Sequence, residues 1–165
     1  MAVRPHRPLF RLNRSTQGGR LVSVPRTFSV AGEQTPLGGS LSGLVSHVSI
    51  DAVTDYVVVD AAGVSNKLGQ FTVTVPHFVH LPTRTAIGTY EFTAANGDKL
   101  YADFTGQAAP TATPGVISIV ETATITGGTG RFAGATGGFV AERLFDRIAG
   151  TTVGFFSGTV SSPGS

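Results

Sequence analysis

Cysteine and tryptophan are absent from this 165-residue sequence, and methionine occurs once. Without cysteine the chain can form no disulfide, no thiolate metal site and no cysteine nucleophile. Long apolar runs are also missing. No stretch approaches the roughly 20 apolar residues of a transmembrane helix, and residues 1–26 lack the apolar core of a secretory signal. The sequence therefore predicts no membrane span and, by default, a cytoplasmic protein.

Charge is scarce as well, and it is unevenly distributed. Charged residues make up 13% of the sequence, about half the usual share of a soluble domain, which suggests that partner subunits cover part of the surface. The first 26 residues carry six arginines and no acid (+6), whereas the rest of the chain carries −4. Such an arm could grip nucleic acid, an anionic lipid surface or the acidic body of a neighbouring subunit, or it could be a solvated leader. Phe10 is its only aromatic residue, so stacking on nucleic-acid bases is not expected.

Glycine, by contrast, is plentiful. Its 22 residues, together with many Val, Thr and Phe, are typical of short strands joined by tight turns. The length and the apolar share of 41% suit one domain with a sizeable core. We therefore divide the chain into a Pro- and Arg-rich arm, 1–26, and a single β domain, 27–165, with a second irregular stretch at 32–43.

Short runs of β-branched and aromatic residues, bounded by Gly, Pro, Asn or Asp, recur along the β domain. They predict strands near 27–31, 44–50, 53–60, 69–76, 87–94, 99–105, 116–126, 138–145 and 151–160. No window keeps a helical period over three turns. Strands at this spacing indicate a sandwich or a barrel, and a barrel leaves no open edge to protect. We predict an all-β, antiparallel barrel with little helix.

Asn96-Gly97 gives the clearest local signal, a hairpin turn between two alternating runs. A three-residue loop with a left-handed Gly97 sorts the side chains cleanly by face. It places Tyr90 and Phe92 on the same face as Phe104, whereas a two-residue turn would mix that face with Asp103. The sequence therefore predicts the three-residue loop.

The next hairpin carries one charge in each of two apolar rows. Glu121 lies in the middle of the row that contains Ile117 and Ile119, and Arg143 lies in the row that contains Phe139. If the loop 127–137 is symmetric about Phe132, Glu121 lies directly opposite Arg143. Such neighbours have Cβ atoms about 5 Å apart, which is close enough for an ion pair.

The loop of this hairpin reads Thr126-Gly127-Gly128-Thr129-Gly130-Arg131-Phe132-Ala133-Gly134-Ala135-Thr136-Gly137. It joins two strands, whereas a dinucleotide fingerprint or a P-loop needs a helix after the glycines, so we do not expect phosphate binding. We expect a compact turn whose glycines take positive φ while Phe132 plugs one end of the barrel.

This loop resembles a segment that joins the last strands in the allene oxide cyclase and dirigent-protein superfamily, including bacterial allene oxide cyclase barrel-like proteins. The hairpin from Phe92 to Asp98 and the strand start from Asn66 to Thr72 also look like theirs, so the resemblance covers roughly 65–160. It implies an eight-stranded barrel with a hydrophobic cavity, often oligomeric through its outer wall. Characterised members, including relatives in polyketide biosynthesis, guide cyclisation or coupling of apolar substrates without a cofactor. No catalytic residue is carried over, and the plant cyclase's cysteine has no counterpart here.

Glu121 and Arg143 are the candidate catalytic residues. Removing each ion from water costs several kcal/mol. Charged residues that face a barrel lumen therefore need a functional or structural role that offsets this cost. The pair could orient a polar substrate head, stabilise an oxyanion or keep Glu121 as an acid or base. The alternatives are a structural ion pair at the barrel rim and an outward face buried by another subunit.

The candidate substrate-binding residues are apolar or aromatic. Those expected to line the lumen are Tyr90, Phe92, Phe104, Ile117, Ile119 and Phe139, with Tyr56 as a further hydroxyl that could equally face outward. The alternative is a small barrel filled by its own side chains.

The sequence gives little support for metal-dependent catalysis or for a serine nucleophile. His77 and His80 fall on opposite faces of one strand, so no metal site is expected. No serine sits in a nucleophile elbow. We therefore expect a cofactor-independent cyclase or isomerase that acts on an apolar, flexible small molecule, within a homo-oligomer. The alternatives are a non-catalytic oligomeric barrel and a passive carrier of a lipophilic ligand.

Overall fold

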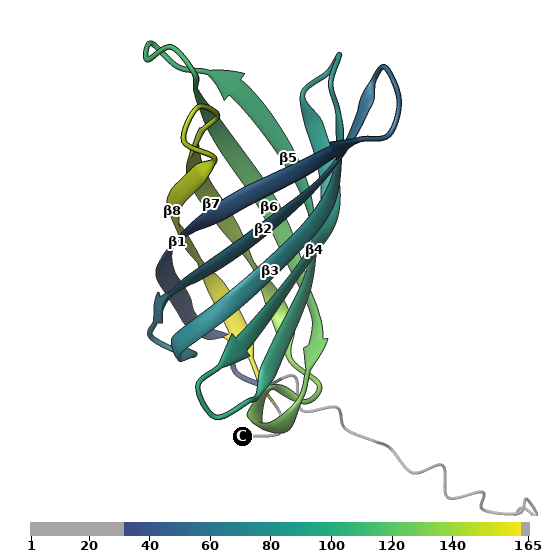
Figure 1. Cartoon of the computed structure of the whole chain (residues 1–165). Coiled ribbons are helices and arrows are strands. Elements are labelled where there is room, and N and C mark those ends of the chain that lie inside the picture. The colour runs from purple at the N-terminus through teal and green to yellow at the C-terminus, as the bar shows by residue number, and fades with distance from the viewer. Residues whose placement is uncertain (1–31, 163–165) are drawn as a thin grey trace, which may run out of the picture.

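The computed structural model describes residues 32–162, which form a closed antiparallel barrel of eight strands (Figure 1). Each strand pairs with the next, and β8 closes the barrel by pairing with β1. The elements are β1 (Thr35–Ser49), β2 (Thr54–Ser65), β3 (Gly69–His80), β4 (Thr85–Ala94), β5 (Lys99–Pro110), β6 (Val116–Gly128), the 3-10 helix η1 (Gly130–Phe132), β7 (Thr136–Asp146) and β8 (Thr151–Ser161). The predicted all-β, eight-stranded barrel with little helix is confirmed. The predicted strand at 27–31 and the arm at 1–26 lie outside the described residues.

β1 corrects one expectation, because residues 35–43 of the stretch 32–43 are not irregular but belong to this strand. Its glycines, which suggested a loop, lie where neighbours come too close for a side chain. A Cβ atom at Gly39 would meet the backbone oxygen of Val64 at 2.6 Å and the ring of Phe156 at 2.8 Å. Pairing with β2 and β8 on both sides outweighs the weak strand preference of glycine.

The β4–β5 hairpin has the predicted three-residue loop. Ala94 and Asp98 flank it, with the Ala94 amide 2.8 Å from the Asp98 carbonyl oxygen, and Gly97 takes a left-handed φ of 90°. Phe92 therefore pairs with Leu100 and faces the barrel interior.

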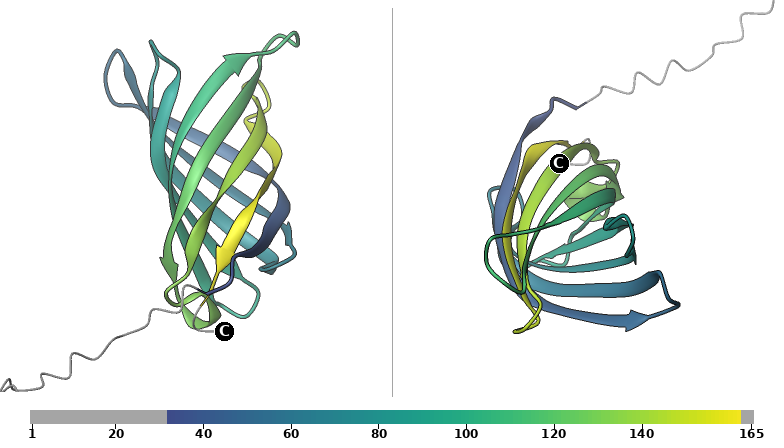
Figure 2. Two further views of the ribbon diagram at one scale, coloured as in Figure 1. Left: turned by 180° about the vertical axis from the view of Figure 1, so that it is seen from behind. Right: turned by 90° about the horizontal axis from the view of Figure 1, so that it is seen from above.

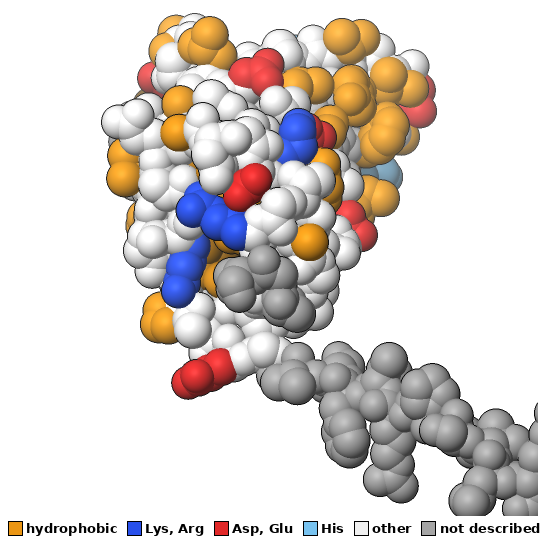
Figure 3. Space-filling model, turned by 90° about the horizontal axis from the view of Figure 1, so that it is seen from below, with side chains coloured by type: hydrophobic (Ala, Val, Ile, Leu, Met, Phe, Trp, Pro, Cys, Tyr) orange, Lys and Arg blue, Asp and Glu red, His pale blue; other side chains and the backbone are white. Residues whose placement is uncertain are grey.

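The end of the barrel that carries η1 is closed. Phe132 in η1 is buried under the strands, together with Leu68 from the β2–β3 loop. Gly130, with φ of 57°, has no room for a side chain, because a Cβ atom would lie 2.0 Å from Asp98 Oδ1. Seen from below, basic and acidic side chains lie side by side over this end (Figure 3). The predicted plug is confirmed.

Inward side chains are packed near the closed end and are less buried toward the other end, which we call the open end. The left view in Figure 2 shows the strands wound around one axis, with the loops 50–53, 81–84, 111–115 and 147–150 toward the end opposite η1. Inward side chains near the closed end are fully buried, whereas those of Val45, Val57, Val79 and Ile117 near the open end are only half-buried. The core therefore ends partway along the barrel.

Candidate functional site

The two charged residues of the β6–β7 hairpin do meet, but diagonally. Glu121 pairs with Ala141, and Arg143 pairs with Ile119. The expected direct pairing of Glu121 with Arg143 is therefore wrong by two residues, because the hairpin is centred one residue before Phe132, where the chain coils into η1. A shift of two residues keeps every side chain on its face, so both charges still point inward.

The carboxylate and the guanidinium form a two-pronged, buried ion pair. Arg143 Nε lies 3.0 Å from Glu121 Oε2, and one terminal nitrogen lies 2.5 Å from Oε1. The other terminal nitrogen donates to Thr152 Oγ1 at 3.1 Å, and the Tyr90 hydroxyl donates to Glu121 Oε2. Glu121 is 0% exposed and Arg143 4% exposed. We call Tyr90, Glu121, Arg143 and Thr152 the polar cluster.

Glycines on neighbouring strands make room for the polar cluster. Gly106 pairs with Glu121, and a Cβ atom there would lie 3.1 Å from Glu121 Cγ. Gly154 pairs with Arg143, and a Cβ atom there would lie 2.7 Å from Arg143 Cγ. Both long side chains therefore lie flat along the inner wall instead of projecting across the lumen.

Burial and pairing set the protonation states of the polar cluster. Burial, reinforced by the charge of Glu121, holds the pKa of Tyr90 well above its usual range, so this hydroxyl stays neutral. Burial alone would lower the pKa of Arg143, but its hydrogen bonds and ion pair with Glu121 raise it. The cluster thus holds a permanent cation against a carboxylate.

The four aromatic candidates point inward, but they fill the lumen rather than line an open space. Tyr90 and Phe92 stack with ring centres 5.5 Å apart, and Phe104 and Phe139 pack edge-on against Tyr90 at 5.1 and 5.2 Å. All four are at most 4% exposed. Together they fill the lumen across its width, and we call this aromatic layer the floor. The expectation that these four residues line a cavity is therefore wrong.

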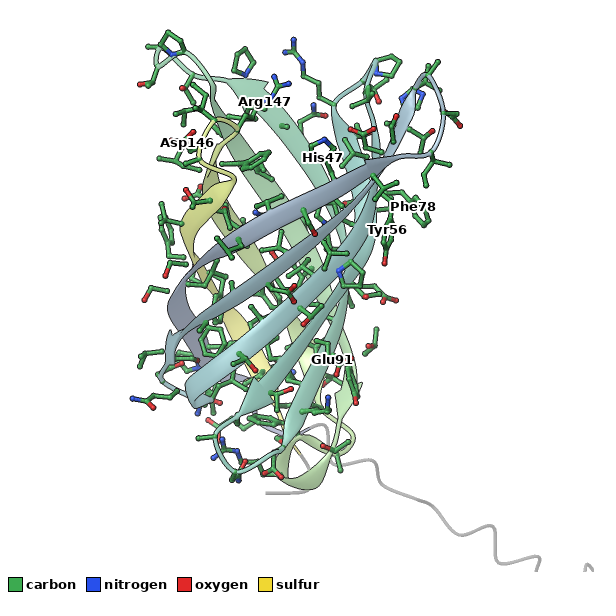
Figure 4. All side chains as sticks on the ribbon, viewed as in Figure 1. His47, Tyr56, Phe78, Glu91, Asp146 and Arg147 are labelled. Carbon is green, nitrogen blue, oxygen red and sulfur yellow. The ribbon has the colours of Figure 1, made fainter. Side chains whose placement is uncertain are left out.

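The remaining candidates are divided between the two faces of the wall. Ile117 and Ile119 point inward and are half-buried, so they do line the open half of the lumen. Tyr56 lies on the outer wall, against Phe78 at 5.2 Å between ring centres (Figure 4). Its place in the lumen was a wrong expectation, because Val59 and Ala61 occupy the inward positions of β2.

Two polar residues of the lumen were not among the sequence candidates for this site. Thr152 lies on the same face of β8 as Phe156, so the strand pattern of the sequence indicates that it points inward. Its hydrogen bond with Arg143 on another strand could not be predicted from that pattern. His77 is buried on β3 beside Phe104, with ring centres 5.6 Å apart. The sequence suggests His77 only as a possible metal ligand.

The part of the chain from 32 to 162 holds no group of three or more metal-ligating side chains. Within the same residues, no helix has the length and apolarity needed to cross a membrane.

The chain is similar in structure to solved proteins but matches no known protein family in sequence. No family model and no curated protein sequence matches the chain. The solved structure of the pterocarpan synthase dirigent protein GePTS1 superposes with a TM-score of 0.55 at 15% identity, over 81% of this chain and 87% of that one. The pterocarpan synthase dirigent protein PsPTS1 gives a TM-score of 0.53 at 13% identity, over 79% of this chain and 96% of that one. The chain therefore has the eight-stranded barrel fold of the dirigent proteins, as the resemblance in its glycine-rich loop predicts.

Proposed function

We propose that this protein is a cofactor-independent cyclase or isomerase that takes an apolar, flexible small molecule into the open half of its barrel. The observation that carries this proposal is the polar cluster, which lies where the packed core gives way to half-buried lining. A buried ion pair is weak evidence for stability, since apolar residues of similar size often stabilise as well or better. The likeness in fold to two pterocarpan synthase dirigent proteins supports a role in small-molecule synthesis.

The geometry favours charge stabilisation by Arg143 over proton transfer by Glu121. Both oxygens of Glu121 already accept hydrogen bonds from Arg143 or Tyr90. A guanidinium has five N–H groups, and the described residues accept three of those on Arg143. Tyr90 also acts on Arg143 through a side-chain hydrogen bond, and the N–H group that remains can donate to a carbonyl or a developing oxyanion on a ligand above the floor. Half-buried Ile117 and Ile119 would hold the apolar part of that ligand and keep its reacting ends close.

One observation favours a second candidate, a non-catalytic oligomer. Val48, Tyr56, Phe78 and Ile87 lie directly beside one another on β1 to β4 and form an apolar row across the outer wall. Three of them are at least half exposed. Exposed apolar patches of this kind mark interaction sites. In this alternative the row packs against a second subunit in a cytoplasmic assembly, and the basic arm at 1–26 contacts the acidic body of a neighbour.

The two candidates are separated by looking for conversion at constant mass. Isomerisation, and cyclisation by intramolecular addition, leave the formula of a substrate unchanged. We expect the protein, incubated with an extract of apolar metabolites, to deplete one compound and produce another of equal mass but different retention in chromatography with mass spectrometry. Arg143→Met combined with Glu121→Leu should abolish the conversion, because it removes the N–H donors without leaving an unpaired buried charge.

Glu142→Gln is the matched control, because Glu142 lies next to Arg143 on β7 but faces outward and is exposed. It should convert the compound like the unmodified protein. A compound that is retained but never converted would establish carriage in place of catalysis. If no compound is depleted or retained, the proposed reaction is wrong and the oligomer is the better description.

A further inference from the structure

His77 lies in the lumen with one ring nitrogen occupied and the other free. Nδ1 is 2.9 Å from the carbonyl oxygen of Val75 on the same strand. A carbonyl oxygen only accepts, so Nδ1 carries the hydrogen in this contact. In the neutral ring Nε2 is then a bare acceptor, and the hydrogen bond fixes this tautomer.

No residue within 32–162 bonds to Nε2. Every fully buried side-chain nitrogen or oxygen in that range has a hydrogen-bond partner, so Nε2 borders accessible space even though His77 as a whole is only 6% exposed. The ring is held by its edge-on contact with Phe104 and by the bond to Val75. This acceptor is therefore positioned by the fold and has no partner in it.

The wall beside His77 is built of very small residues. Gly88 on β4 pairs directly with His77, and the next inward residue on β4 is Ala86. On β5 the corresponding inward positions are Gly106 and Ala108. These strands put no long side chain in front of the imidazole, so a ligand can approach it.

We infer that His77 Nε2 is a ligand-binding acceptor in the open half of the barrel, and that it takes a hydrogen bond from an O–H or N–H group on an otherwise apolar ligand. This inference rests on the proposed function for the existence of a ligand, and it adds the chemical group that the ligand must carry. Arg143 offers only donors, and Glu121 is 0% exposed with both oxygens already accepting hydrogen bonds, so His77 supplies an acceptor that borders accessible space.

The protonation state of His77 agrees with this role. The titratable groups that act on it are Glu121 on β6 and Arg143 on β7. Burial lowers the pKa of His77, outweighing the bond to Val75 and the attraction of Glu121, while Arg143 lowers it further. The ring is therefore neutral near pH 7 and able to accept.

The test compares indole with 1-methylindole, which has the same ring system but no N–H. Their binding to the full chain is measured by fluorescence titration. We expect indole to bind more tightly by about three- to tenfold, the value of one net hydrogen bond. His77→Phe should keep the contact with Phe104 and bring the two affinities to within about twofold. His80→Phe, on the outer face of the same strand, is the control and should keep the preference for indole.

Nitrogen-15 chemical shifts of the imidazole provide a second readout that does not depend on ligand affinity. They should report a neutral ring with the hydrogen on Nδ1. Equal binding of both probes to the unmodified protein, or a hydrogen on Nε2, would overturn the role of His77 and leave the proposed reaction standing. If neither probe binds, the ligand site itself is absent and both proposals fail.

Discussion

Arg143 on β7 lies across Gly154 on β8, its direct neighbour in the sheet. A Cβ atom at Gly154 would come within 2.7 Å of Arg143 Cγ and 2.4 Å of the Glu142 carbonyl oxygen. The glycine therefore determines where the guanidinium stem runs, and through it the position of the ion pair with Glu121.

Gly154→Ala should destabilise the fold by about 1–3 kcal/mol, as overpacking does, because the backbone contact gives no room to relax. Denaturant unfolding measures the loss. Gly38→Ala is the control, since the nearest atom to its Cβ position is 3.3 Å away. Equal stability of the two variants would contradict the close approach at Gly154.

Breaking the buried ion pair on one side should cost more than removing it altogether. Glu121→Leu or Arg143→Met alone should each destabilise by about 3–5 kcal/mol, because one charge is left buried and unpaired. The double variant should be more stable than either single one. The free energies of unfolding of these three variants and of the unmodified protein form a double-mutant cycle that isolates the coupling.

The exposed pair of Glu91 and Lys99 provides the control cycle, since solvent screens it. Its coupling should be much smaller. Additive losses at Glu121 and Arg143 would show that the two residues do not interact in solution.

Phe132→Ala should open the closed end of the barrel. Phe132 is 3% exposed, so the substitution leaves a cavity and should cost about 3–5 kcal/mol. Phe155→Ala removes an equal ring that is 54% exposed on the outer wall, and its cost should be well below that of Phe132→Ala. Similar losses in thermal unfolding would mean that Phe132 is not a plug.

His77 should make the fold less stable in acid. Its pKa is lowered in the folded chain because the ring is buried, so the unfolded chain takes up the proton first as pH falls below about 6.5. Stability is therefore lost with decreasing pH in that range. His77→Phe should flatten this part of the curve, measured by urea unfolding between about pH 5 and about pH 8. Parallel curves for the two proteins would contradict the burial of a neutral His77.

Alternation and turn chemistry in the sequence determined the barrel, the loop at Gly97, the plug at Phe132 and the inward direction of Glu121 and Arg143. These features depend on neighbours in the chain, because side chains in a strand change face with every residue.

Only the tertiary structure decided which residues on different strands meet. It placed Glu121 diagonally from Arg143, because η1 moved the centre of the hairpin. It put Tyr56 outside, packed the aromatic floor solid and left His77 Nε2 without a partner. Register, closure of the barrel and the depth of packing depend on contacts between distant residues, and no local pattern records those.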